Sequence, residues 1–257
     1  MGIVSPYSRL EKAGALGYPS VLMKRTAAAL ALLIGMAPLA AMAQSSIVSQ
    51  IAGDKVATED LYFSLKFGLN VAHLRGPAAA ARTGGFNVGI TATIKLTPRL
   101  SLVPEISPFS RKGAEKIPFT PTGDPEIDLR FADPTSSALA LSYLDLPVLV
   151  KYRLGRFHVG AGAFVSFLQT ATESFRAELA TGEEISFKRT VDDRYKKSDY
   201  GLVFEASWTI TKPRRGVGLV FHLRFQAGFV DVLKDPAAAG AVRNSVIQAY
   251  LSFPFVH

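Results

Sequence analysis

Cysteine is absent from the 257-residue sequence, and charged residues make up only 19% of it. Without cysteine the chain has no disulfides, no thiolate metal ligands, no thiol nucleophile and no lipoprotein anchor. With 48% hydrophobic residues and so few charges, the composition also argues against intrinsic disorder. The mean hydropathy of +0.21 is high for a water-soluble domain. We therefore expect part of the protein surface to face a non-aqueous solvent.

The excess of basic residues does not form a nucleic-acid-binding pattern. The formal net charge is +8 and the pI is near 9.7, but the basic residues are scattered along the chain instead of being concentrated on one face. The first 43 residues hold four basic residues and one acidic residue, so their removal lowers the net charge to +5. We expect no nucleic-acid partner.

The N-terminal region has the parts of an export signal. Lys24 and Arg25 precede an apolar stretch, and Ala-Met-Ala at 41–43 supplies a small-residue cleavage site. The alternative is a single membrane anchor, which needs about 20 strongly apolar residues. This stretch is mostly alanine and contains Pro38. The expected segments before the main domain are 1–22, an upstream extension or misassigned start; 23–43, a signal peptide cleaved between Ala43 and Gln44; and 44–60, a short periplasmic segment.

From residue 61 onward, hydrophobic residues alternate with polar or small ones at a period of two, as in β-strands. The eight alternating stretches are 61–72, 86–96, 100–107, 144–153, 157–167, 199–210, 217–226 and 247–255. Three short connections (97–99, 154–156, 211–216) alternate with four long ones (about 74–84, 112–137, 172–198, 232–243).

Strand length and loop alternation together indicate a membrane barrel. The strands exceed the usual 5–6 residues and reach the roughly 9–11 that a tilted transmembrane strand needs. Short turns on one rim and long loops on the other are typical of outer-membrane barrels. The alternative, a water-soluble barrel of the lipocalin type, has a charged exterior, whereas here one strand face is almost uncharged. We predict an all-β protein of the cell outer membrane, in which residues 61–257 form an eight-stranded antiparallel transmembrane β-barrel with short periplasmic turns and long extracellular loops.

Aromatic residues gather near the predicted strand ends, where membrane proteins place interfacial girdles. One group lies beside the short turns and the C-terminus: Tyr152, Phe157, Trp208, Phe253 and Phe255. The other lies near the long loops: Phe167, Tyr200 and Phe229.

The stretch Tyr143–Tyr152, YLDLPVLVKY, resembles the "YLEIPVLLKY" strand of the PorT-like outer membrane β-barrel family of Bacteroidetes. Further matching blocks follow the same order: Phe67–Asn70, Leu102–Ser107 with Lys112-Gly113, Gly160–Gly162 and Asp199–Val203. The resemblance covers about residues 61–255 and implies an outer-membrane barrel of about eight strands. Most members have no assigned activity; one class is implicated in type IX secretion, but these blocks do not select it. The sequence departs from the pattern at its end, where Val256 and His257 follow the terminal aromatic residue.

Polar side chains on the second strand face should point into the barrel. An eight-stranded barrel is filled by its own side chains, and buried charges must be paired, so we expect a structural network in the lumen. Counting back from the 211–216 turn places Glu205 opposite His222 with Arg224 diagonal to it. The alternative is a gated polar path or a small-ligand pocket. The predicted network comprises Lys66, Lys95, Glu105, Asp145, Lys151, Glu205, His222 and Arg224.

Catalytic candidates are few, because the chain has four histidines. His158 and His222 face inward, whereas His73 ends the first strand, where Asp192 and Asp193 of the third long loop could approach it, as in outer-membrane proteases. Loop acids are usually solvated, and no phosphate loop or metal-ligand spacing stands out. We expect no catalytic residues, no metal site, no cofactor and no enzymatic activity.

The third long loop carries a group of cations: Lys188, Arg189, Arg194, Lys196 and Lys197. They are either solvated or in contact with lipopolysaccharide phosphates, which attract clustered cations. Within the same loop, residues 175–187 suggest a hairpin that extends the fifth and sixth strands, or two further barrel strands.

These features predict an outer-membrane protein with a structural or interaction role, whose extracellular loops are the recognition surface. A narrow channel or a transport or secretion component is the first alternative, and an enzyme is the second. The expected partners are outer-membrane lipid, lipopolysaccharide, the barrel assembly machinery and an envelope protein that the sequence does not identify.

Overall fold

The computed structural model describes residues 60–76, 80–179, 181–211, 216–235 and 240–256, and most of its regular structure is β-strand. The expected signal peptide, its cleavage site and nearly all of the 44–60 segment lie outside the described residues. The strands are β1 (Leu61–Arg75), β2 (Thr83–Lys95), β3 (Leu100–Glu115), β4 (Ser136–Leu154), β5 (Phe157–Glu178), β6 (Glu184–Thr190), β7 (Ser198–Thr211), β8 (Gly216–Val217), β9 (Leu219–Gly228) and β10 (Arg243–Val256). The described helices are α2 (Pro125–Arg130) and the 3-10 turn η1 (Asp192–Arg194), and neither is long and apolar enough to cross a membrane.

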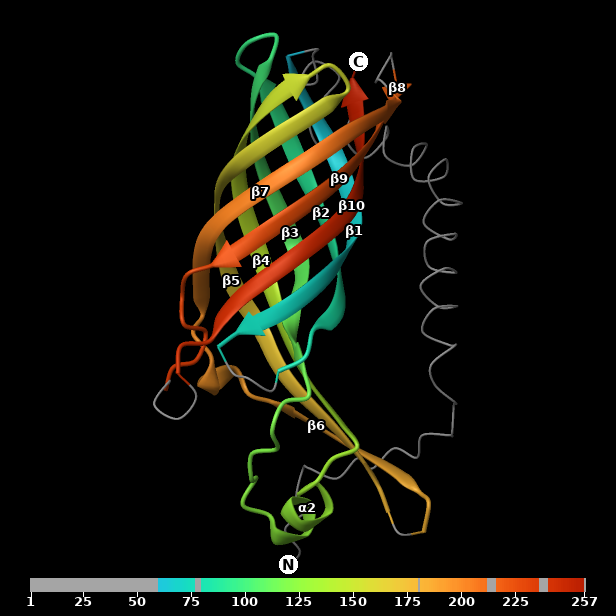
Figure 1. Ribbon diagram of the computed structural model, residues 1–257, viewed down its shortest axis with the longest axis vertical. Coiled ribbons are helices and arrows are strands. Elements are labelled where there is room, and N and C mark those ends of the chain that lie inside the picture. The colour runs from blue at the N-terminus through green and yellow to red at the C-terminus, as the bar shows by residue number, and fades with distance from the viewer. Residues whose placement is uncertain (1–59, 77–79, 180, 212–215, 236–239, 257) are drawn as a thin grey trace, which may run out of the picture.

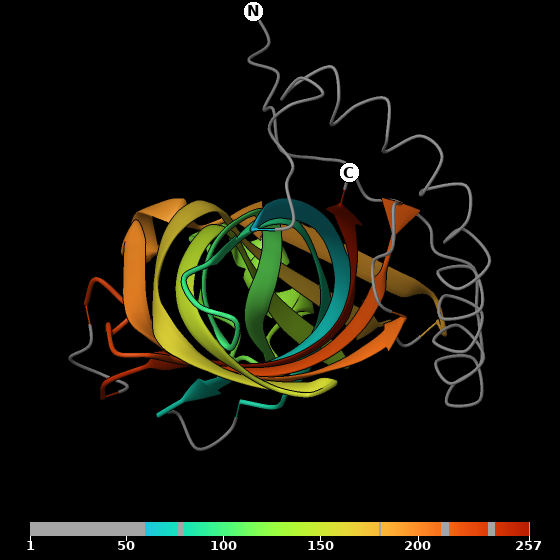
Figure 2. The ribbon, with the colours of Figure 1, turned by 90° about the horizontal axis from the view of Figure 1, so that it is seen from above.

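Eight strands close into an antiparallel barrel, which appears as a ring when viewed from above (Figure 2). Their order is β1-β2-β3-β4-β5-β7-β9-β10, and β10 returns to pair with β1. This last pairing is long, from Phe63 opposite Phe255 to Arg75 opposite Arg243. Because the sheet is closed, each barrel strand has a hydrogen-bonding partner strand on both sides. A sheet in lipid requires this, since lipid tails cannot form hydrogen bonds with the backbone. The predicted eight-stranded antiparallel barrel is confirmed.

The outer surface of the barrel is apolar, whereas polar side chains are buried inside it. On β9, for example, Phe221, Leu223 and Phe225 are exposed, while His222 and Arg224 between them are buried. This is the reverse of a water-soluble protein and is the arrangement of a membrane barrel. The other barrel strands expose a similar set, including Leu69, Val71, Phe86, Ile90, Ile106, Phe109, Val148, Val150, Val159, Val165, Leu202, Phe204 and Ile247.

The two ends of the barrel differ. The connections 96–99 and 155–156 lie at one end, together with the start of β1 and the end of β10, and we call it the short-turn end. The other, the long-loop end, carries β6 and α2, at the bottom of Figure 1. The loop alternation predicted from the sequence is therefore present.

Three strands continue past the barrel at the long-loop end and run further than their alternation predicted. β3 reaches Glu115, β4 begins at Ser136 and β5 continues to Glu178. β6 pairs with the outer part of β5, from Thr172 opposite Thr190 onward. The third long loop thus forms a hairpin that extends the sheet and adds no strand to the barrel wall. We call residues 116–142 and 170–190 the extension.

The extension has a hydrophobic core of its own. Phe131, Phe175, Ala177 and Ile185 are buried together, and residues including Phe119 and Phe187 pack against them. Phe119 meets Phe175 edge-on, with ring centroids 5.0 Å apart. The extension is therefore a packed substructure held by side chains.

Short polar contacts between neighbouring residues hold the start of α2 in place within the extension. Asp124 caps the helix by accepting the N–H of Glu126 at 3.0 Å. Asp128 accepts the backbone N–H of Thr122 at 2.7 Å, and this bond holds the pKa of the Asp128 carboxyl below its usual value.

Most of the predicted interfacial aromatic residues lie on the outer surface, with one departure. Phe253 is only 6% exposed, because it packs edge-on against Phe67 at a centroid distance of 6.3 Å. Phe157 is half-buried, and the side chain of Phe255 lies outside the described part of the structure. The exposed members are Tyr152, Phe167, Tyr200, Trp208 and Phe229.

Candidate functional site

Charged and polar side chains from six strands fill the middle of the barrel and contact one another. We call this group the central cluster. Its members are Lys66 (β1), Glu105 (β3), Lys151 (β4), Glu205 (β7), His222 and Arg224 (β9), with Tyr250 and Ser252 from β10.

Arg224 is the centre of this cluster, and its side chain is 0% exposed. Its two terminal nitrogens donate to both carboxylate oxygens of Glu105, at 2.8 and 2.7 Å. Its Nε and Nη2 donate to Glu205 Oε2 at 2.9 and 2.5 Å. The Tyr250 hydroxyl accepts from Nη2 at 2.6 Å and donates to Glu205. A guanidinium in this geometry satisfies two carboxylates at once, which a lysine ammonium does not match.

Two lysines complete the charge balance around these carboxylates. Lys66 Nζ lies 2.7 Å from Glu105 Oε2, and Lys151 Nζ lies 2.6 Å from Glu205 Oε1. Gly89 makes room for the first of them, since a Cβ at that position would lie 2.8 Å from Lys66 Cε. With three cations against two carboxylates, the central cluster carries a formal excess of one positive charge when His222 is neutral.

His222 lies between a serine and a carboxylate. Its Nδ1 is 2.9 Å from Glu205 Oε1 and its Nε2 is 2.7 Å from Ser252 Oγ, while its ring stacks on Tyr250 at 4.3 Å. β10 is paired on both sides at Ser252, with Lys66 and with Val220. These contacts hold the imidazole in one orientation inside the barrel.

The predicted register between β7 and β9 is wrong. Glu205 lies opposite Arg224, and Ser207 lies opposite His222. The cause is where the ladder starts: Thr211 lies opposite Leu219, whereas a count from a 211–216 turn places Ile210 opposite Val217. Glu205 and His222 still meet, but on the diagonal.

A second buried ion pair lies nearer the long-loop end. Lys112 Nζ is 3.0 Å from Asp145 Oδ1 and donates to Ser166 Oγ at 3.0 Å. The ammonium also lies over the ring of Tyr143, 4.6 Å from its centroid. Asp145 therefore belongs to this pair and not to the central cluster. Sequence reasoning missed Lys112 because it placed residue 112 at the start of a loop.

Lys95 also lies apart from the central cluster. Its side chain is 33% exposed at the short-turn end, and its Nζ is 4.0 Å from Asp60 Oδ1. The predicted single network is thus divided into a central cluster, a separate buried pair and one cation at the mouth of the lumen.

Apolar side chains close the long-loop end of the lumen. Buried residues from β1, β3, β4, β5 and the loops at this end pack there in one cluster, which we call the apolar cap. Its members are Leu74, Ala114, Leu139, Leu141, Tyr143, Leu168, Ala171, Val191, Tyr195, Val232 and Val242. The apolar cap and the central cluster together fill most of the interior, as expected for eight strands.

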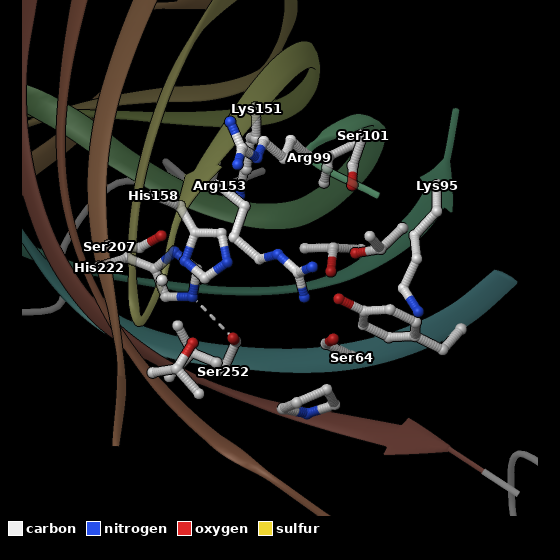
Figure 3. A pocket seen from close by; sticks show the side chains of 18 of the residues that line it. Ser64, Lys95, Arg99, Ser101, Lys151, Arg153, His158, Ser207, His222 and Ser252 are labelled. Atoms are coloured by element: carbon white, nitrogen blue, oxygen red, sulfur yellow. Dashed lines mark hydrogen bonds between the residues drawn. The ribbon is translucent and has the colours of Figure 1, made fainter. Parts of the chain in front are cut away.

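A cavity of about 320 Å³ opens at the short-turn end, and we call it the vestibule. Figure 3 shows Lys95 and Arg153 extending into it, with His158, His222 and Ser252 gathered on one side. Side chains of the central cluster form its inner end, so the vestibule stops within the barrel. The remaining lining includes Tyr62, Ser64, Thr91, Thr93, Arg99, Ser101, Lys151, Ser207 and Thr209.

The sequence matches the family described as outer membrane protein β-barrel domain over residues 42–234. This chain belongs to that family. It is therefore an outer-membrane β-barrel protein, as the apolar exterior and closed sheet of the structure also indicate.

Solved structures similar to this outer-membrane barrel share little sequence with it. The attachment invasion locus protein Ail of Yersinia pestis, solved with the heparin analogue sucrose octasulfate, is 8% identical; the match covers 76% of this chain and 99% of Ail, with a TM-score of 0.35. Neisserial surface protein A is 13% identical over 76% of this chain and 96% of its own, with a TM-score of 0.37. AlkL, solved in lipid bilayers, is 8% identical over 79% and 94%, with a TM-score of 0.38. The comparison with curated proteins found no match.

The proposed rim site of this outer-membrane barrel is not assembled. The residues that flank His73 on β1, Ala72 and Leu74, are buried inside, so strand alternation turns His73 toward the outer surface. Asp192 instead accepts the backbone N–H of Ala171 at 2.5 Å. Within the described ranges, no group of three or more His, Asp or Glu side chains is arranged to hold a metal ion.

Proposed function

We propose that this outer-membrane barrel has a structural or interaction role, with the extension as its recognition surface and a lumen that does not conduct. The single observation that carries this proposal is the extension, which has its own core beyond the barrel wall. Outer-membrane barrels place their longer loops outside the cell, so we assign the extension to the exterior and the short-turn end to the periplasm. Binding residues are often carried by loops that a rigid scaffold positions, and the continuous strands β4 and β5 provide that scaffold.

Replacing Phe175 by alanine should disorder the extension and leave the barrel folded. Phe175 is 0% exposed at the centre of the extension core, and truncating a buried phenylalanine costs about 3–5 kcal/mol. Limited proteolysis should then cut within residues 116–142 or 170–190. The unboiled protein should still migrate differently from the boiled protein on a gel, which reports an intact barrel.

The same variant tests the proposed role. Intact outer-membrane extracts are passed over the immobilised wild type, Phe175→Ala and the matched control Phe204→Ala, whose ring lies 49% exposed on the barrel exterior. A partner retained by the wild type and by Phe204→Ala, but not by Phe175→Ala, supports recognition through the extension. A partner retained equally by all three proteins would place recognition elsewhere.

The purified protein should give no stepwise conductance in planar lipid bilayers. Conduction needs a continuous polar path, whereas the central cluster and the apolar cap occupy successive levels of the lumen. Reproducible single-channel steps at neutral pH, absent from a blank detergent addition, would favour the alternative of a narrow channel or transport component.

We further propose that the chain belongs to the PorT-like subgroup. The polar residues of the motif at 143–152 support this assignment, because they are the ones that build the lumen. Tyr143 and Asp145 contact Lys112, and Lys151 contacts Glu205. The motif therefore specifies interior contacts of the barrel.

Lipopolysaccharide is the lipid partner that we propose for the long-loop end. A groove there is lined by Phe86, Phe109, Arg111 and Lys188, among others. Phe86 and Phe109 are more than half exposed, so apolar rings and cations lie side by side, as the acyl chains and phosphates of this lipid require.

A further inference from the structure

We propose that the vestibule is a binding site for a small phosphate-bearing anion. The site lies at the short-turn end, opposite the extension, and does not depend on the proposed recognition role. Three observations carry the proposal: the charge of the lining, the donors that it presents and the size of the cavity.

The lining of the vestibule is basic. Lys95, Arg99, Lys151 and Arg153 all border the cavity, and none of the described residues that line it is acidic. Lys151 is already paired with Glu205, and Lys95 Nζ lies 4.0 Å from Oδ1 of Asp60, whose side chain is 85% exposed. The central cluster behind Lys151 has three cations for two carboxylates. Cations around a low-dielectric cleft concentrate the field and attract anions.

The donors of the vestibule suit a tetrahedral oxyanion. The guanidiniums of Arg99 and Arg153 form fork-like pairs of hydrogen bonds with phosphate oxygens more readily than with a single-point acceptor. Hydroxyl groups surround them and can donate to the remaining oxygens of the anion. The lining hydroxyl residues are Tyr62, Ser64, Thr91, Thr93, Ser101, Ser207, Thr209 and Ser252.

The size of the vestibule limits the ligand. A volume of about 320 Å³ is at the lower end of the range for small-molecule sites. Inorganic phosphate, a small phosphate ester or the headgroup of a phospholipid fits, whereas acyl chains must remain outside. The free ester and the lipid headgroup share the same chemistry, and the experiment has to separate them.

The test uses the full folded chain in a zwitterionic detergent and a buffer without phosphate. Calorimetric titration compares inorganic phosphate, glycerol 3-phosphate and acetate. Lys95→Gln/Arg153→Gln removes two lining cations, and Arg82→Gln/Lys234→Gln removes two exposed cations at the long-loop end, away from the vestibule. We expect the first variant to bind phosphate about tenfold or more weakly, since it loses charge-assisted hydrogen bonds to the anion, and the control to bind as the wild type does. Higher salt should weaken binding further.

The outcomes separate the possibilities. Short-chain phosphatidylglycerol that competes with glycerol 3-phosphate assigns the site to a lipid headgroup, and its failure to compete assigns it to a free solute; either result supports the proposal. Equal weakening in both variants would show a general effect of net charge and overturn it. Equal binding of acetate, or no binding of either phosphate compound, would also overturn it. Gel migration before and after boiling confirms that both variants are folded.

Discussion

Replacing Arg224 by methionine should destabilise the barrel by about 3–5 kcal/mol, because two buried carboxylates lose the guanidinium that they share. The Arg224 side chain is 0% exposed and donates to Glu105, Glu205 and Tyr250. Each carboxylate keeps one lysine, so the loss comes from buried oxygen atoms that no longer have a donor. The unfolding transition in urea, measured in lipid vesicles, should move to markedly lower denaturant, and the heat-dependent gel shift should disappear at a lower temperature.

Two companion variants show whether the lost hydrogen bonds are the cause. Arg156→Met removes an exposed arginine of the 155–156 turn, and we expect less than about 0.5 kcal/mol from it. Arg224→Lys keeps the charge and loses the paired hydrogen bonds of the guanidinium, so its stability should be intermediate. If Arg224→Lys is no more stable than Arg224→Met, the loss comes from packing and not from the hydrogen bonds to the carboxylates.

The sequence predicted the barrel well because its signal is local. On β9, Phe221, Leu223 and Phe225 alternate with His222 and Arg224 within a few residues, and this alternation alone separates the lipid face from the lumen. The extension was harder to predict, since the outer positions of β4 above the barrel are Ala138, Ala140 and Ser142. Such small residues produce no clear alternation outside the membrane.

The sequence could predict which residues face the lumen, but not which of them contact each other. Glu105 and Arg224 are 119 positions apart, and they meet because closure of β10 onto β1 brings distant strands around a common interior. The register error between Glu205 and His222 has another origin: the ladder starts with Thr211 opposite Leu219 and not with Ile210 opposite Val217, and this offset continues into the later pairs. A small-ligand pocket was the alternative for the lumen, but its position could not be predicted. The cations of the vestibule come from β2, β4 and the turn between β2 and β3, and their convergence is a property of the closed barrel.

Replacing Lys112 by methionine is the second change for which we expect a large effect, about 3 kcal/mol or more. Lys112 is fully buried, and its ammonium is paired with Asp145 and lies over the ring of Tyr143. The substitution keeps the length of the side chain and leaves the Asp145 carboxylate buried without its cation. Urea unfolding in vesicles should show the loss, whereas the exposed Lys116→Met serves as a control that we expect to be near neutral.

The double variant Lys112→Met/Asp145→Leu gives the decisive comparison. A buried ion pair replaced on both sides by apolar groups is often neutral or stabilising, so the double variant should be clearly more stable than Lys112→Met alone. That recovery would show that the pair selects one arrangement of the lumen and contributes little net stability. Additive losses in the double variant would instead show that the ion pair itself makes a net contribution to the free energy of unfolding of the barrel.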